Sequence, residues 1–196
     1  VLATVEAAVN GGVTCVQLRA KGADGGLFLT QVLEVAEVVG DQVPVIVNDR
    51  VDVFLAARDQ GASVAGVHLG QSDLPAHIAR RLVGEDAYLG LSAATPDELR
   101  TAQEQGACDH VGIGVVHPTA TKVDAPKSLG VNGVARMAAL IDLPAVAIGG
   151  ITASDLPALR AGGLAGAAVV SAICTAEDPR SVAADLHRAW DEGGRR

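Results

Sequence analysis

The chain has 196 residues and a formal net charge of −8 at pH 7. This length suffices for one substantial hydrophobic core, and the acidic balance argues against nucleic acid or an anionic membrane as a partner. No apolar run reaches the roughly 18–20 residues of a membrane-spanning helix, and no secretory signal is visible at the start. Three cysteines without metal-ligand spacing, Cys15, Cys108 and Cys174, indicate small core residues in a reduced, cytoplasmic protein.

Apolar strands and helices alternate along the whole sequence. Aromatic residues make up only 2% of the chain, so the core must consist mainly of Ala, Val, Leu and Ile. After a helix at 2–10, strands are predicted at 13–19, 43–48, 63–69, 87–92, 110–115, 144–148 and 166–170. Helices are predicted at 27–39, 51–58, 74–82, 96–105, 132–140, 154–161 and 179–190, with Thr95 as an N-cap. No linker interrupts the series, so residues 1–196 are expected to form one domain.

The order of these elements predicts the fold class. Strict alternation of helices with continuous apolar strands indicates an α/β protein with a parallel sheet. A helix end with Gly, a small residue and a strand recurs in NGGVTCVQLRA, QGASVAGVHLG, QGACDHVGIGV and AGGLAGAAVVS, with a second type of strand between the copies. Four such two-strand units would close a (β/α)₈ TIM barrel. Because only seven strands are present, we predict that the first strand lies upstream of Val1; an open doubly wound sheet is the alternative.

Polar residues follow the predicted strands, where (β/α)₈ barrels have their active sites. In the first half of the chain they are Gln17, Arg19, Lys21, Asn48, Asp49, Asp73 and Ser92. The first three alternate along an extended segment and therefore share one side. Because Asp49 and Asp73 follow neighbouring strands, we expect their carboxylates to converge on a Mg²⁺ ion shared with substrate phosphates. The alternative is that each of them caps the helix that follows it.

A long polar loop follows the fifth strand, in the segment GIGVVHPTATK. A strand-to-helix loop of this length is expected to be functional, and the Thr119, Thr121 and Lys122 side chains suit phosphate oxygens. The chain has only three lysines, Lys21, Lys122 and Lys127, and all of them come after predicted strands. This placement favours lysines kept at anion sites, and a composition that simply prefers Arg is the alternative. A solvated surface loop is the alternative for the segment as a whole.

Two later turns are candidates for binding phosphate through backbone N–H groups. Gly149 and Gly150 precede a helix, and so does the turn at Val170 and Ser171. The loops after the last two strands of a (β/α)₈ barrel commonly hold phosphate, although tight turns of this kind also occur without a ligand.

Two histidines also lie near strand ends. Neither His68 nor His117 has a partner spaced for metal binding or for a catalytic triad. His68 is expected to be a packed, hydrogen-bonded residue. The role of His117 stays open.

The segments VQLRAK, VIVNDRVD, GVHLGQSDLP, GLSAAT, VGIGVVHPTATK, VAIGGI and VVSAI resemble the successive motifs of the thiamine-phosphate synthase family, from about residue 13 to 173. The resemblance implies a (β/α)₈ barrel and a Mg²⁺-dependent transferase that joins hydroxymethylpyrimidine diphosphate to thiazole phosphate. In that family diphosphate leaves first, and the thiazole nitrogen captures the resulting cation.

The resemblance also implies a role for each matching residue. Asp49 and Asp73 would bind Mg²⁺, and Lys122 and Ser92 would be the catalytic residues on the diphosphate and the pyrimidine. The remaining contacts would be Gln17, Arg19, Lys21 and Asn48 to the pyrimidine diphosphate, and Thr119, Thr121, Gly150, Val170 and Ser171 to the thiazole phosphate.

Two positions depart from the family's pattern: Ala94 stands where His is usual, and His117 where an aromatic residue is usual. A thiazole tautomerase-like isomerase and a non-catalytic binder of thiamine precursors are the alternative functions. The isomerase would need one phosphate cradle and an acid–base pair, but no metal. The apolar composition is compatible with a homodimer.

Overall fold

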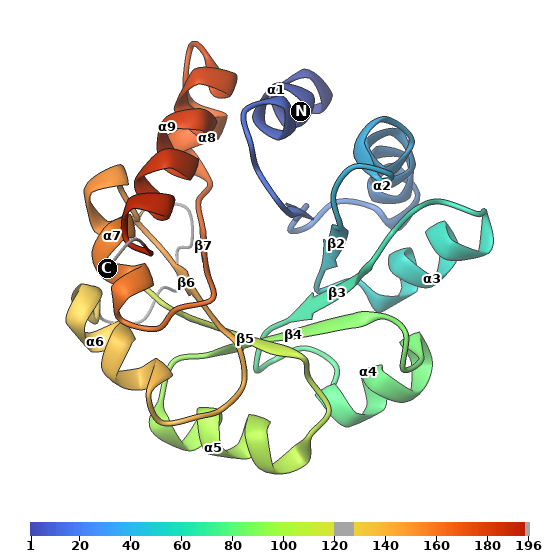
Figure 1. The fold of residues 1–196 in the computed structure, drawn as a ribbon. Helices are drawn as coiled ribbons and strands as arrows, with labels where there is room; N and C mark the ends of the chain where they lie inside the picture. The colour runs from blue at the N-terminus through green and yellow to red at the C-terminus, as the bar shows by residue number, and fades with distance from the viewer. Residues whose placement is uncertain (120–127, 195–196) are drawn as a thin grey trace.

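The computed structural model describes residues 1–119 and 128–194, which fold as a curled parallel sheet with helices around its outside (Figure 1). Within these residues seven strands pair in chain order: β1 Val16–Leu18, β2 Val45–Asn48, β3 Gly66–Leu69, β4 Tyr88–Ala93, β5 His110–Gly114, β6 Ala145–Ile148 and β7 Gly166–Ala168. A doubly wound sheet would reverse its strand order, so this order excludes it. The predicted TIM-barrel class is confirmed, and the strand upstream of Val1 stays a prediction.

In the described residues one helix precedes β1, one α-helix follows each of the strands β1 to β6, and two helices follow β7. They are α1 Leu2–Asn10, α2 Gly25–Val39, α3 Val51–Asp59, α4 Ala76–Val83, α5 Pro96–Gln105, α6 Gly130–Ala138, α7 Leu156–Ala161, α8 Ser171–Cys174 and α9 Pro179–Glu192, with the 3₁₀ turn η1 Ala153–Asp155 before α7. In the part of the chain that is described, no helix combines the length and the apolar character that crossing a membrane requires.

The strand register separates the sheet into two faces. On the outer face Val47 pairs with Val67 and Val67 with Leu89; all three are 0% exposed and belong to one core with helix residues such as Phe54. The opposite face, called here the inner face, includes Gln17, Ile46, Asn48, His68, Gly90, Ser92, His110 and Gly112. The outer face therefore packs against the helices, and the inner face carries mostly polar and small residues together with the buried Ile46.

Helix α5 begins and ends where its sequence predicts. The Glu98 backbone N–H donates to Thr95 Oγ1 at 3.2 Å, and the Thr95 N–H donates to Glu98 Oε2 at 3.2 Å. This capping box satisfies two N–H groups that a helix start otherwise leaves unpaired, and Pro96 at the first helical position suits the same turn. The predicted N-cap is confirmed.

Helix α1 packs against α9 and so joins the first and last helices of the described chain. Gly11 ends α1 with a φ of −89°, and a Cβ at this position would lie 2.4 Å from the Arg180 carbonyl oxygen. It would also lie 2.7 Å from Ala183 Cβ. The close approach of the two helices therefore depends on the missing side chain.

Several local predictions need correction. Strand β1 begins at Val16 rather than at residue 13, because its first ladder bond runs from the Val16 N–H to the Pro44 carbonyl oxygen. Cys15 precedes that bond and is exposed, and Cys174 ends the one-turn helix α8 and is also exposed, so only Cys108 is a buried core residue. The predicted helix at 154–161 divides into η1 and α7, and the helix expected after the turn at Val170 and Ser171 is the four-residue α8, for which the sequence predicted no bounds.

Candidate active site

The polar residues of the first four strands share the inner face. Asn48 ends β2 and pairs with His68 on β3, while Ser92 on β4 pairs with Gly112. Gln17 pairs with Ile46, two residues before Asn48, so its side chain lies on the same face. Three of the predicted substrate-binding residues, Gln17, Asn48 and Ser92, therefore share the inner face. Arg19 and Lys21 continue the chain beyond β1 and are exposed.

Asp49 is held at the junction of β2 and α3 in an unusual conformation. Its φ is +64°, a region that residues other than glycine seldom occupy, and such strain is often found at functional sites. Its N–H donates to the His68 carbonyl oxygen at 2.8 Å, which fixes the residue beside the end of β3. The N-cap of α3 is Arg50, not Asp49, so the capping alternative is wrong for this residue.

Asp73 is turned back towards the end of β3. Its Oδ2 accepts a hydrogen bond from the Gly70 N–H at 2.6 Å, and its own N–H donates to the Gly70 carbonyl oxygen at 3.2 Å. Gly70 directly follows Leu69, the last residue of β3. The N-cap of α4 is Pro75, so the capping alternative is wrong here too. Both acidic residues are therefore anchored at the end of the same strand.

Two carboxylates at adjacent strand ends fit the predicted magnesium chemistry. Within residues 1–119 and 128–194 no group of three or more His, Cys, Asp or Glu side chains is placed to hold a metal ion. Mg²⁺ is usually bound by one or two protein carboxylates, with water and substrate phosphates completing its octahedron. Asp49 and Asp73 fit an ion of this kind better than a metal bound by protein ligands alone.

His68 lies on the inner face and forms a hydrogen bond with the Ser92 side chain. Its Nε2 lies 2.9 Å from Ser92 Oγ, and its ring centroid lies 5.6 Å from that of His110. Burial lowers the pKa of His110, and the Asp109 carboxylate offsets only part of this effect, so the His110 ring is neutral at neutral pH. A Cβ at position 90 would lie 2.3 Å from His68 Nδ1, so Gly90 makes room for the ring. The prediction of a packed, hydrogen-bonded His68 is confirmed.

The second half of the candidate site is built from the ends of β5 and β6. The N–H groups of Val116 and His117 donate to the carbonyl oxygens of Ile148 and Gly149, each at 3.0 Å. Gly149 and Gly150 have φ values of +94° and +67°, which favour glycine in this turn. His117 Nε2 also lies 3.0 Å from Asp155 Oδ1.

The remaining predicted residues lie after β5 and β7. Thr119 is half-buried and follows His117 by two residues. Val170 is the N-cap of α8 and Ser171 is its first residue. Thr121 and Lys122 lie outside the described residues.

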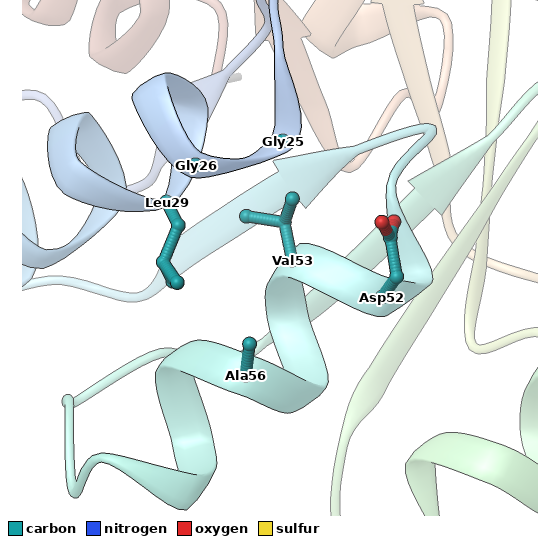
Figure 2. Close-up of a pocket in the computed structure, with 6 residues that line it drawn as sticks. All are labelled: Gly25, Gly26, Leu29, Asp52, Val53 and Ala56. Carbon is teal, nitrogen blue, oxygen red and sulfur yellow. The ribbon is translucent and has the colours of Figure 1, made fainter.

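A separate recess lies between the starts of α2 and α3, lined by Gly25, Gly26, Leu29, Asp52, Val53 and Ala56 (Figure 2). Its charged side chain, Asp52, accepts a hydrogen bond from Arg50 Nε at 2.8 Å. The hydrogen bonds from Arg50 hold the pKa of Asp52 below its ordinary value. Asp52 is thus an ionised carboxylate paired with Arg50, and none of the predicted site residues lines the recess.

Comparison with known proteins decides the family. Residues 1–173 match the family model of thiamine monophosphate synthase. The chain is 44% identical over 178 residues to the thiamine-phosphate synthase of Vibrio campbellii. The alignment covers 90% of this chain and 84% of that protein. The chain belongs to the thiamine monophosphate synthase family. The predicted activity, thiamine-phosphate synthase in thiamine biosynthesis, is confirmed.

Two further members of the family support this assignment. The thiamine-phosphate synthase of Corynebacterium efficiens is 41% identical over 187 residues, covering 95% of this chain and 87% of that protein. Among solved structures, the thiamine phosphate pyrophosphorylase of Pyrococcus furiosus superposes with a TM-score of 0.86 at 30% identity. That superposition covers 98% of this chain and 90% of the other.

Two contacts in this thiamine monophosphate synthase family member were not predicted from its sequence. Gln71 Nε2 donates to the Ser92 carbonyl oxygen at 2.7 Å and so ties the loop that carries Asp73 to β4. Asp155 contacts His117, 38 residues away. The only available signal for Asp155 was the Thr-x-x-Asp pattern from Thr152, which indicates a helix cap and not a contact with another loop.

Proposed function

We propose that this chain joins hydroxymethylpyrimidine diphosphate to thiazole phosphate at the strand ends of its inner face. The bond between the pyrimidine methylene carbon and the diphosphate oxygen breaks, and the thiazole nitrogen forms a new bond to that carbon. Diphosphate leaves with the electron pair. The site must therefore stabilise negative charge on diphosphate and hold the thiazole nitrogen near the cationic carbon.

The pyrimidine diphosphate is assigned to the first four strands. Gln17, Asn48 and Ser92 offer amide and hydroxyl groups on one face, which suits the polar edge of a pyrimidine ring. Arg19 and Lys21, which follow β1, would supply positive charge for the phosphates. A Mg²⁺ ion held by Asp49 and Asp73 would neutralise charge on the departing diphosphate.

The thiazole phosphate is assigned to the ends of β5, β6 and β7. Backbone N–H groups at Gly150, Val170 and Ser171 would bind its phosphate, with Thr119 and Thr121 beside it. Lys122 would contact the diphosphate, as the family resemblance implies.

A homodimer stays a prediction of the sequence, which light scattering can test.

One observation carries the assignment of the diphosphate site. Asp49 is fixed to the His68 carbonyl oxygen at 2.8 Å, and the Asp73 carboxylate is fixed to the Gly70 N–H at 2.6 Å. Both residues are therefore anchored within a few residues of the end of β3. Neither serves as the helix cap that would otherwise explain an aspartate at its position.

The test is a coupling assay with both substrates, run over a range of Mg²⁺ concentrations. Asp49→Asn and Asp73→Asn should each lower kcat/KM by on the order of 10²–10³-fold, because each variant loses a carboxylate that would hold the Mg²⁺ ion stabilising the leaving diphosphate. Calorimetry with Mn²⁺ and pyrimidine diphosphate should show weaker metal binding in both variants, independently of turnover.

Asp185→Asn is the matched control, since Asp185 pairs with Arg188 at 3.0 Å on the surface of α9. It should keep wild-type rates and metal affinity. If Asp49→Asn and Asp73→Asn behave like Asp185→Asn, the metal assignment is wrong. If the wild-type chain forms no thiamine phosphate, the proposed reaction is wrong.

A further inference from the structure

Asp155 is a strongly hydrogen-bonded carboxylate in the turn after β6. Its Oδ2 accepts from the Thr152 N–H and from Thr152 Oγ1, both at 2.8 Å, and its Oδ1 lies 3.0 Å from His117 Nε2. The Asp155 side chain is 12% exposed. Burial raises its pKa, but the hydrogen bonds from His117 and Thr152 outweigh this effect and lower the pKa overall. The carboxylate is therefore ionised at neutral pH.

His117 stands at the start of the loop that carries Thr119. Its backbone N–H donates to the Gly149 carbonyl oxygen at 3.0 Å. A Cβ at position 150 would lie 2.8 Å from the His117 carbonyl oxygen and 2.9 Å from His117 Cβ. The histidine thus lies directly against the glycine turn that we assign to the thiazole phosphate.

The backbone of this segment is also fixed on its other side. The N–H groups of Leu129 and Gly130 donate to the carbonyl oxygens of Val115 and Val116, at 2.9 and 3.0 Å. These bonds fix residues 115–117, but they do not fix the orientation of the His117 side chain. That orientation is set by Asp155, which is itself set by Thr152.

We propose that His117 and Asp155 form a positioning pair that holds the start of the Thr119 loop against the Gly149–Gly150 turn and preorganises the thiazole phosphate half of the site. The inference rests on the proposed function, because it assigns the pair to the phosphate monoester substrate. The pair does not touch the reacting atoms. Its effect is to reduce the ordering that binding of thiazole phosphate requires.

The test compares the KM values of the two substrates. In His117→Phe, which keeps a ring but loses the nitrogen, the KM for thiazole phosphate should rise about tenfold, the effect of losing a hydrogen bond to a charged group. The KM for pyrimidine diphosphate should stay within about twofold of the wild-type value. His117→Gln retains a donor near the Nε2 position and should restore most of the loss.

A double-mutant cycle tests whether His117 and Asp155 act through one shared contact or affect the KM for thiazole phosphate independently. Asp155→Asn alone should raise the KM for thiazole phosphate, and the double variant should be no worse than the poorer single variant within about twofold, because both changes break one contact. His187→Phe is the matched control: His187 lies 3.5 Å from Asp191 on α9 and is similarly exposed. It should leave both KM values unchanged. Circular dichroism confirms that each variant is folded.

The proposal is overturned if His117→Phe leaves the KM for thiazole phosphate unchanged, or raises both KM values equally. It is also overturned if the two substitutions act additively. Absence of coupling activity in the wild-type chain would instead contradict the proposed function. In that case calorimetry with thiazole phosphate decides the role of the pair: about tenfold weaker binding in His117→Phe supports it, and equal binding overturns it.

Discussion

The packing of His68 depends on a neighbour that has no side chain. Gly90 lies between the rings of His68 and His110, and a methyl group there would lie 2.3 Å from one ring and 2.4 Å from the other. His68 lies on β3 and His110 on β5, the strands on either side of Gly90 in β4. The contact between His68 and Ser92 therefore requires glycine at position 90.

Gly90→Ala should destabilise the protein by about 1–3 kcal/mol, the usual effect of overpacking a core. It should also lower coupling activity, because the displaced His68 ring no longer orients Ser92. Urea denaturation and the coupling assay measure the two effects. Gly112→Ala on the same face is the graded comparison, since its Cβ would lie 3.2 Å from His68 Cε1. Equal destabilisation by both substitutions would contradict this account.

At the residue scale, the sequence predicts candidate site residues but not the contacts between them. Asp49, Asp73 and Ser92 were predicted because polar residues after apolar strands are unusual and easily seen. The hydrogen bond from Gln71 to Ser92 and the contact between His117 and Asp155 join separate loops. A single sequence does not contain the distance between two loops, so these contacts required coordinates.

At the element scale, the capping box of α5 gives a local test. Thr95→Ala should destabilise the protein by about 1 kcal/mol, because the Glu98 N–H loses its acceptor at the helix start. Chemical denaturation measures the change. Thr101→Ala, an exposed position within the same helix, should be neutral or slightly stabilising, since Ala has the higher helix propensity. A loss in Thr101→Ala equal to that in Thr95→Ala would show that the cap is not responsible.

The same helix explains which elements could be predicted accurately. Helix α5 matches its predicted bounds because Thr95 and Pro96 mark its start and Gly106, in the left-handed conformation, marks its end. Helix α8 has four residues, too few for a hydrophobic period, so its bounds could not be predicted. The start of β1 was predicted too early, because apolar residues precede the first ladder bond.

At the scale of the whole molecule, the contact of α1 with α9 joins the two ends of the helical ring. Gly11→Ala should destabilise the protein by about 1–3 kcal/mol, because the added Cβ would meet the Arg180 carbonyl oxygen. Gly26→Ala is the control: position 26 is helical, and nothing lies within 4 Å of a Cβ there. It should stabilise the protein by up to about 1 kcal/mol. Thermal denaturation compares the two, and a loss of stability in Gly26→Ala would contradict the steric explanation.

The division of the sheet into an outer apolar face and an inner polar face bears on how proteins of this kind can diverge. Alternate residues of one short strand belong to different faces, as Val47 and Asn48 do. Changes at positions such as Asn48 or Ser92 alter the polar groups of the inner face, while the outer face keeps its contacts with the helices. A directed-evolution library restricted to inner-face strand ends would sample new chemistry on an unchanged scaffold.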